Sequence, residues 1–105
     1  MQAETKKVYN LLGLAQKSRN LVSGSFMTEK TIKDGKARLV IVSADASGNT
    51  KKMFGDKCTH YKVPLYIYGE SMEMGHALGK EARVSLAVTD SGFAKAIIKH
   101  LERQQ

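Results

Sequence analysis

The sequence predicts an α/β protein, a three-layer α/β/α sandwich in which residues 1–105 form a single domain. Apolar runs rich in β-branched residues alternate along the chain with segments whose apolar residues recur at helical spacing. The chain has 105 residues, enough to bury one hydrophobic core without a disulfide or a metal. Because strands that alternate with helices form a sheet with helices on both faces, the pattern favours three layers.

The first half of the chain contains four predicted elements. Apolar residues at helical spacing, among them Val8 and Leu12, indicate the first helix, and Ser23 to Ser25 supply the turn and cap of the second. An uninterrupted apolar run is typical of a strand buried on both faces. The elements are a helix over 4–17, an extended piece at 21–22, a helix over about 25–34 that ends at Gly35, and a strand over 39–43.

The second half continues the alternation after a predicted polar loop at 45–49. Phe54, Cys58 and Tyr61 share one helical face, and the chain turns at 62–64. The remaining predicted elements are a strand over 65–68, a helix over 70–78, a strand over 85–88, and a last helix, capped by Asp90 or Ser91, that buries Phe93, Ile97, Ile98 and Leu101.

The chain lacks the sequence signals of secretion, membrane spanning and cofactor binding. Its longest uninterrupted apolar run covers residues 39–42, and Cys58 is its only cysteine, so we expect a cytoplasmic protein whose thiol is buried. Nucleotide-binding glycine motifs, a nucleophile elbow and paired cysteines are all absent from the sequence. We therefore expect no cofactor, no metal and no small-molecule substrate, and we expect that the protein is not an enzyme.

Three titratable residues are candidates for a catalytic role. Asp45 follows a central strand, where α/β proteins place functional groups, and could serve a small phosphoryl-transfer enzyme. An aspartate that opens a loop more often makes a local turn bond, and we favour that interpretation. His76 and His100 are expected at the surface or near helix ends rather than in a catalytic site.

A net charge of +7 favours a polyanionic partner. The excess lies in residues 1–52, which hold ten basic and four acidic side chains, whereas residues 53–105 hold seven and six. Lys17, Arg19 and Lys30 surround the predicted start of the second helix, whose free N–H groups attract phosphate oxygens. A second cluster, residues 79–84, mixes cations with apolar groups that could pack on an unstacked base. A solvated lysine-rich surface is the alternative interpretation.

Ordered motifs along residues 5–101 resemble the L7Ae/L30e ribosomal protein family. The resemblance rests on the runs 24–30 and 35–47, on Cys58, on the strand entry at 63–65, and on residues 73–79, which are similar to the family pattern Glu-Leu-Gly-x-Ala-x-Gly. Residues 56–58 and 79–84 are most similar to the bacterial YlxQ-type branch of the family.

The resemblance implies a four-stranded mixed sheet and recognition of kink-turn RNA, a sharply bent duplex with a bulge and tandem sheared G·A pairs. The family motif Gly-x-Asn-Glu-x-x-Lys begins the second helix; Gly24 and Lys30 match it, but Phe26 stands at the Asn position and Met27 at the Glu position. Neither can accept a hydrogen bond from a guanine edge. Phe26 could stack on a base instead, or pack on the protein itself. The family's loop over the flipped-out nucleotide corresponds to residues 82–84.

We therefore expect a ribosomal-protein-like RNA-binding protein that acts as a monomer on a kink-turn or related bent internal loop of ribosomal or regulatory RNA. The alternative is a protein-interaction module on the same scaffold, with Phe26 and Met27 as an apolar contact patch. The expected RNA-binding residues are Lys17, Arg19, Gly24, Ser25, Phe26, Met27, Lys30, Lys33, Ala82, Arg83 and Val84.

Overall fold

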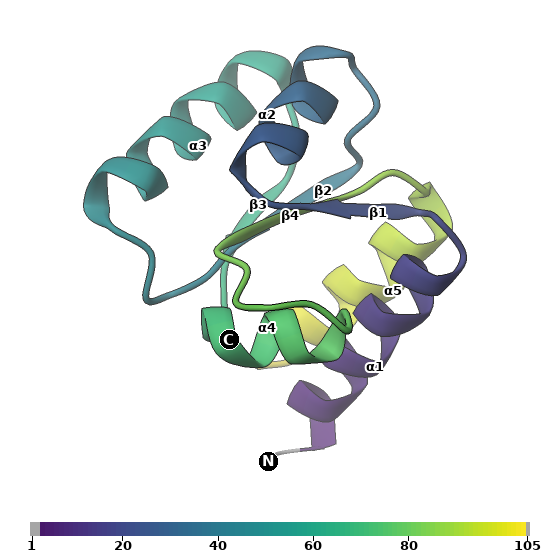
Figure 1. The fold of residues 1–105 in the computed structure, drawn as a ribbon. Helices are drawn as coiled ribbons and strands as arrows, with labels where there is room; N and C mark the ends of the chain where they lie inside the picture. Colours follow the sequence, from purple (N-terminus) through teal and green to yellow (C-terminus); the bar gives the residue numbers. More distant parts are fainter. Residues whose placement is uncertain (1–2, 105) are drawn as a thin grey trace.

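Helices cover both faces of a four-stranded sheet (Figure 1). The computed structural model describes residues 3–104. In chain order its elements are α1 (Ala3–Lys17), β1 (Leu21–Ser23), α2 (Ser25–Lys33), β2 (Leu39–Val42), α3 (Gly48–Tyr61), β3 (Leu65–Ile67), α4 (Ser71–Ala77), β4 (Ser85–Val88) and α5 (Ser91–Glu102). The architecture confirms the predicted three-layer α/β/α sandwich.

The sheet is mixed, as the family resemblance implied. Its strand order is β1-β4-β2-β3. β4 runs antiparallel to both of its neighbours, β1 and β2, whereas β2 and β3 are parallel. β4, the last strand in the sequence, therefore lies inside the sheet, between the edge strand β1 and the parallel pair of β2 and β3.

The two faces of the sheet carry different helices. α1, α4 and α5 lie on one face, and α2 and α3 lie on the other (Figure 1). Successive side chains of a strand point to opposite faces, so Leu39 and Ile41 of β2 pack toward the first layer, and Val40 and Val42 toward the second. All four are fully buried, which explains the uninterrupted apolar run in the sequence.

The third helix ends where it was predicted to end but differs from its prediction in its start and in the burial of Tyr61. α3 begins at Gly48, inside the predicted loop at 45–49, because the Ser47 hydroxyl accepts a hydrogen bond from the Thr50 N–H at 3.1 Å and caps the helix. Tyr61, expected on the buried face with Phe54 and Cys58, is 42% exposed. It is the last helical residue, and the chain then turns through Lys62 in the left-handed conformation.

The last helix follows its prediction at the cap and in most of its core. The Asp90 carboxylate accepts a hydrogen bond from the Phe93 N–H at 2.8 Å. Ile97 and Leu101 are buried, whereas Phe93 and Ile98 are only partly buried at the edge of the same cluster. None of the described helices is long and apolar enough to cross a membrane.

α4 packs its backbone directly against the loop that precedes β4. A Cβ atom at Gly75 would lie 1.9 Å from the Glu81 carbonyl oxygen and 2.9 Å from the Ala82 Cα. The Arg83 N–H also donates to the Ser71 carbonyl at 2.9 Å, at the first residue of α4. The missing side chain at Gly75 therefore allows α4 to support residues 79–84.

Replacing Gly75 with alanine should destabilise the fold, because the new methyl group would collide with the backbone at Glu81. We expect a loss of at least about 1–3 kcal/mol in the free energy of unfolding, measured by urea denaturation. Gly55→Ala in α3 is the matched control: a Cβ there meets nothing within 4 Å, so the substitution should stabilise by about 0.5–1 kcal/mol. Equal effects of the two substitutions would contradict the close packing of α4 on the loop.

Candidate nucleic-acid interface

The start of α2 and the loop at 79–84 lie next to each other because β1 pairs with β4. Ser23, the last residue of β1, pairs with Leu86, and the Gly24 N–H donates to the Ser85 carbonyl at 2.9 Å. The chain enters β4 at the end of the sheet where α2 begins (Figure 1). Two clusters that are about 55 residues apart in the sequence thus border one surface, which we call the α2–loop surface: residues 23–27, 30 and 33 with residues 79–84.

The N-terminus of α2 is open to solvent and carries no side-chain cap. Gly24 has φ 92°, a conformation that strains any other residue, and a Cβ placed on it would meet nothing within 4 Å. α3 and α5 begin differently, since Ser47 and Asp90 cap them. The first-turn N–H groups of α2 and its positive dipole end are therefore available to an anion that approaches the backbone closely.

Phe26, Lys30 and Lys33 form one stripe on α2. Their spacing of four and three residues places them on the same side of the helix, and all three line a shallow hollow of about 380 Å³. Phe26 is 75% exposed. This exposure excludes the interpretation that Phe26 packs on the protein itself, and Met27 beside it is 41% exposed.

Each lysine of the stripe pairs with an acidic side chain of the same helix or its cap. The Lys30 ammonium lies 2.8 Å from the Asp34 carboxylate, and the Lys33 ammonium lies 3.5 Å from Glu29. Exposed pairs of this kind contribute roughly 0–1 kcal/mol, so exchanging the carboxylate for a phosphate costs little. Both lysines can therefore turn to a phosphate when one is present.

Lys57 is a neighbouring cation that sequence reasoning missed. It projects from α3, and its ammonium lies 3.4 Å from the same Glu29 carboxylate that Lys33 contacts. The residue lies 24 positions after Lys33, and neither motif nor spacing in the sequence signals the contact. Only the packing of α2 against α3 brings the two lysines together.

The loop at 79–84 is fixed by Arg83, whose role differs from the expectation. The Arg83 Nε–H donates to the Ser23 hydroxyl at 3.1 Å, and its guanidinium also donates to the Ala82 carbonyl at 3.1 Å. Arg83 is half-buried rather than fully exposed, and Val84 packs against the core with its neighbours in β2 and α3. Of the three residues predicted to cover a nucleotide, Ala82 alone is exposed, with Lys80 and Glu81 beside it.

Lys17 and Arg19 lie away from this surface. They precede β1, whereas Gly24 follows it, and a strand of three residues spans about 10 Å. Both are exposed, and Lys17 lines a groove between α1 and α4. The start of α2 therefore gathers Lys30 and Lys33 but not the two cations that precede it in the sequence.

Asp45 bonds to a distant residue rather than within its own turn. Its carboxylate accepts hydrogen bonds from the Ser71 hydroxyl at 2.8 Å and from the Ser71 N–H at 3.1 Å. The nearby Ser43 hydroxyl and the hydrogen bonds from Ser71 lower the pKa of this carboxyl below its usual value. Asp45 thus holds the start of α4, which corrects the predicted local turn bond.

Cys58, His76 and His100 lie on three different helices, α3, α4 and α5. Cys58 is buried, and that burial raises its pKa to about 11. His76 is exposed, and His100 lies against the Glu4 carboxylate at 2.5 Å near the end of α5. Among residues 3–104, no group of three or more His, Cys, Asp or Glu side chains is placed to hold a metal ion.

A family model with the description Ribosomal protein L7Ae/L30e/S12e/Gadd45 family matches residues 6–98. The chain belongs to this family. The RNA-binding protein YlxQ of Bacillus subtilis (strain 168) is 46% identical over 94 residues, which cover 90% of this chain and 94% of that protein. This similarity agrees with the YlxQ-type motifs at 56–58 and 79–84.

Two solved structures have the same fold. A protein with unknown function from Bacillus halodurans C superimposes with a TM-score of 0.88 at 38% identity, covering 91% of this chain and 97% of that chain. The Giardia lamblia 15.5kD RNA binding protein superimposes with a TM-score of 0.81 at 18% identity, covering 98% of this chain and 88% of that one. The family is one of RNA-binding and ribosomal proteins rather than enzymes, so the alternative of an enzyme built on Asp45 is dropped.

Proposed function

We propose that the protein binds structured RNA through the α2–loop surface and that its target is a kink-turn or a related bent internal loop. The observation that carries the proposal is the uncapped start of α2, where Gly24 opens the backbone beside the exposed Phe26. Family membership supports RNA as the partner class, since the matched relative is an RNA-binding protein.

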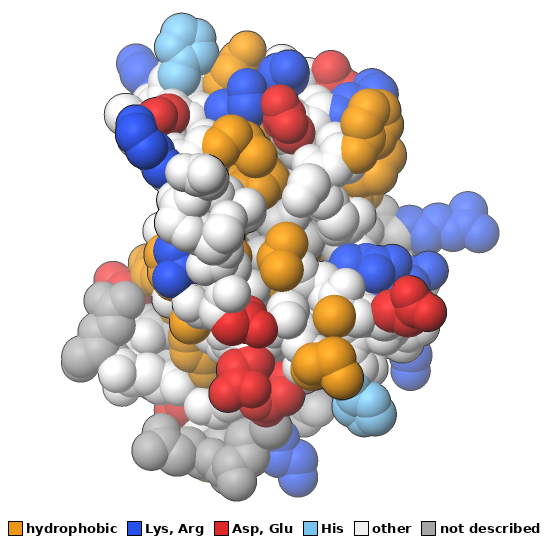
Figure 2. Space-filling model, turned by 60° about the vertical axis from the view of Figure 1, so that its left-hand side comes forward, with side chains coloured by type: hydrophobic (Ala, Val, Ile, Leu, Met, Phe, Trp, Pro, Cys, Tyr) orange, Lys and Arg blue, Asp and Glu red, His pale blue; other side chains and the backbone are white. Residues whose placement is uncertain are grey.

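Phosphate contacts would come from the backbone and from lysines. The N–H groups of Ser25 and Phe26 at the positive end of the α2 dipole would donate to phosphate oxygens of the bent strand. Lys30 and Lys33 would neutralise the phosphates that a sharp bend crowds together. Figure 2 shows Lys and Arg side chains mixed with hydrophobic and acidic ones over the upper part of the molecule, the level of α2 and α3.

Base contacts would come from Phe26 and from the loop. An exposed aromatic ring stacks on an unstacked base at roughly 1–3 kcal/mol per base. The exposed Ala82, held in place by Arg83 and by α4, would cover a flipped-out nucleotide. Because these groups meet only in a bent RNA, binding would select the bent state from the free RNA ensemble.

Exposure of Phe26 and Met27 also favours a second candidate function, a protein-interaction module. Together they form an apolar patch at the helix start, at 75% and 41% exposure. Such a patch suits a protein partner as well as a base. Binding through the first function should depend on the shape of the RNA, whereas binding of a protein partner should not.

The protein should bind a kink-turn RNA saturably and bind a straight duplex of equal length at least about tenfold more weakly, because the start of α2 and the loop contact one bent backbone together. Fluorescence anisotropy with both RNAs at several salt concentrations measures this. Lys30→Ala should weaken binding and flatten its salt dependence, whereas Lys99→Ala on the exposed side of α5 should do neither. Equal affinity for bent and straight RNA would contradict the proposal.

Phe26→Ala should weaken binding to the kink-turn by roughly 5- to 150-fold, the equivalent of one lost stacking contact of about 1–3 kcal/mol. Since the ring is 75% exposed, the thermal unfolding midpoint should not change. Tyr61→Ala, which removes another exposed aromatic ring at the end of α3, is the control and should leave RNA affinity unchanged.

The double variant Phe26→Asn, Met27→Glu tests whether these two positions face the G·A pairs of a kink-turn. Tighter binding would mean that α2 docks as in relatives with polar residues at these positions. Weaker binding, together with a loss in Phe26→Ala, would mean that stacking replaces the polar contacts. Unchanged affinity in both variants would remove these residues from the RNA surface and favour the protein-interaction alternative.

A further inference from the structure

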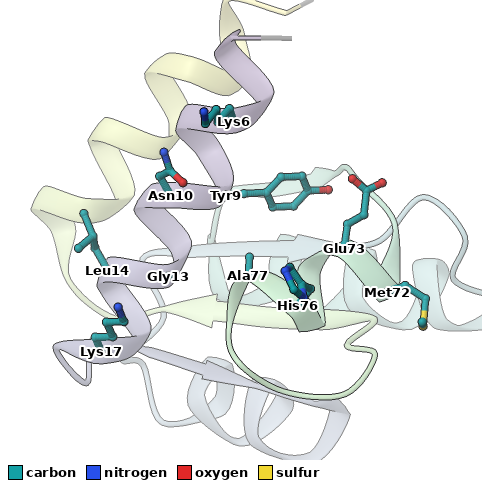
Figure 3. Close-up of a pocket in the computed structure, with 10 residues that line it drawn as sticks. All are labelled: Lys6, Tyr9, Asn10, Gly13, Leu14, Lys17, Met72, Glu73, His76 and Ala77. Carbon is teal, nitrogen blue, oxygen red and sulfur yellow. The ribbon is translucent and has the colours of Figure 1, made fainter. Parts of the chain in front are cut away.

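A groove between α1 and α4 lies on the face of the sheet opposite to α2 (Figure 3). Its volume is about 740 Å³. The two helices approach closely at its floor, where a Cβ atom on Gly13 would lie 3.0 Å from the Ala77 carbonyl oxygen. The absence of a side chain at Gly13 therefore lets α1 and α4 meet below an open channel.

The walls of this α1–α4 groove expose large apolar side chains. Leu14 of α1 is 55% exposed and Met72 of α4 is 71% exposed. Figure 3 shows Leu14 on the α1 side of the groove, and Met72 near the start of α4. No described residue of the chain covers either side chain, and the proposed RNA-binding surface uses neither of them. The groove is therefore an apolar surface to which the proposed function gives no role.

The two walls differ in charge. Lys6 and Lys17 lie near the two ends of the α1 wall, eleven residues or about 16 Å apart along the helix, and neither forms an ion pair with a described residue. Glu73 lies on the α4 wall, and Glu70 precedes the helix. Figure 2 shows carboxylates gathered at the level of α4. The groove thus has a cationic wall and an acidic wall around an apolar centre.

We infer that the α1–α4 groove binds an amphipathic helix of a partner protein, with an apolar stripe in the groove and acidic residues along the edge that faces Lys6 and Lys17. A helix of about three turns matches the spacing of these lysines, and burying an apolar helix face in such a groove is a common mode of recognition. The inference goes beyond the proposed RNA binding and does not depend on it.

Other occupants fit these features less well. A small molecule would not be enclosed, since Leu14 and Met72 are more than half exposed. A second copy of this chain would present the same concave surface and leave a gap. RNA would bring its phosphates close to Glu73 and Glu70, which repel them.

Two synthetic 16-residue helical peptides test the inference on the full chain. Both carry the same leucine stripe; glutamates flank it in one peptide and lysines in the other. A third peptide has the composition of the glutamate peptide with its leucines scattered around the helix. Binding is followed by anisotropy of a fluorescent label and by amide chemical shifts of the ¹⁵N-labelled protein.

The glutamate peptide should bind saturably and shift amides of α1 and α4, whereas the scattered peptide should not bind. The double variant Lys6→Glu, Lys17→Glu should bind the glutamate peptide at least about tenfold more weakly than the unmodified chain does, and it should bind the lysine peptide more tightly. Lys95→Glu with Lys99→Glu on α5 changes the net charge equally and should leave binding nearly unchanged. Leu14→Ser with Met72→Ser should abolish peptide binding and leave kink-turn RNA binding intact.

Absence of amide shifts in α1 and α4 at about 1 mM peptide would overturn the inference. So would equal affinity for the glutamate peptide and the scattered peptide, or an equal loss of affinity in the two charge variants. If the protein sediments as a dimer and the Met72→Ser variant sediments as a monomer, the groove binds a second copy of this chain. A loss of RNA affinity in the groove variants would assign it to RNA. Failure of the proposed function, by contrast, would show as unselective RNA binding with peptide binding unchanged.

Discussion

The antiparallel pairing of β1 with β4 is the constraint on which the candidate interface depends. β1 has three residues, and the Gly24 N–H extends its pairing by one hydrogen bond to Ser85. A one-residue slip in this register would turn Leu21 from the core to the other face and would move the start of α2 away from the loop before β4. The buried apolar side chains of β4 therefore fix the position of a solvent-exposed surface.

α4 provides a second support for the same surface. Asp45 holds its first residue, and Gly75 lets its backbone lie against Glu81. The Arg83 guanidinium then joins the loop to Ser23 at the end of β1. Because α4 also forms one wall of the α1–α4 groove, the two proposed binding surfaces share an element while facing different sides of the molecule.

Much of the fold could be predicted because local pattern determines it. The apolar run at 39–42 indicated a strand buried on both faces, and Gly35 and Asp90 marked the end of one helix and the start of another. The start of α3 was misplaced because polar residues that favour a loop also suit the first turn of a capped helix. The family resemblance supplied the mixed character of the sheet, which propensity alone does not determine, whereas the strand order came only from the structure.

The candidate interface could be predicted only in part, because its contacts join distant residues. Arg83 and Ser23 are 60 positions apart, and Asp45 and Ser71 are 26 apart, so neither bond leaves a local signal. The exposure of Phe26 likewise depends on how α2 packs, and sequence spacing left its direction open. The α1–α4 groove was not predicted at all, because it forms between two helices that are adjacent in space but far apart in the sequence.

An amide chemical-shift titration of the ¹⁵N-labelled full chain with a kink-turn RNA tests directly whether the α2–loop surface binds RNA. If the α2–loop surface binds the RNA, the largest shifts should fall on residues 23–27 and 79–84, with smaller ones at Lys30 and Lys33. The amide signals of residues on the exposed side of α5, including Lys95 and Lys99, should not shift. Shifts concentrated on α5 or α3, with the start of α2 unchanged, would show that RNA binds elsewhere on the molecule.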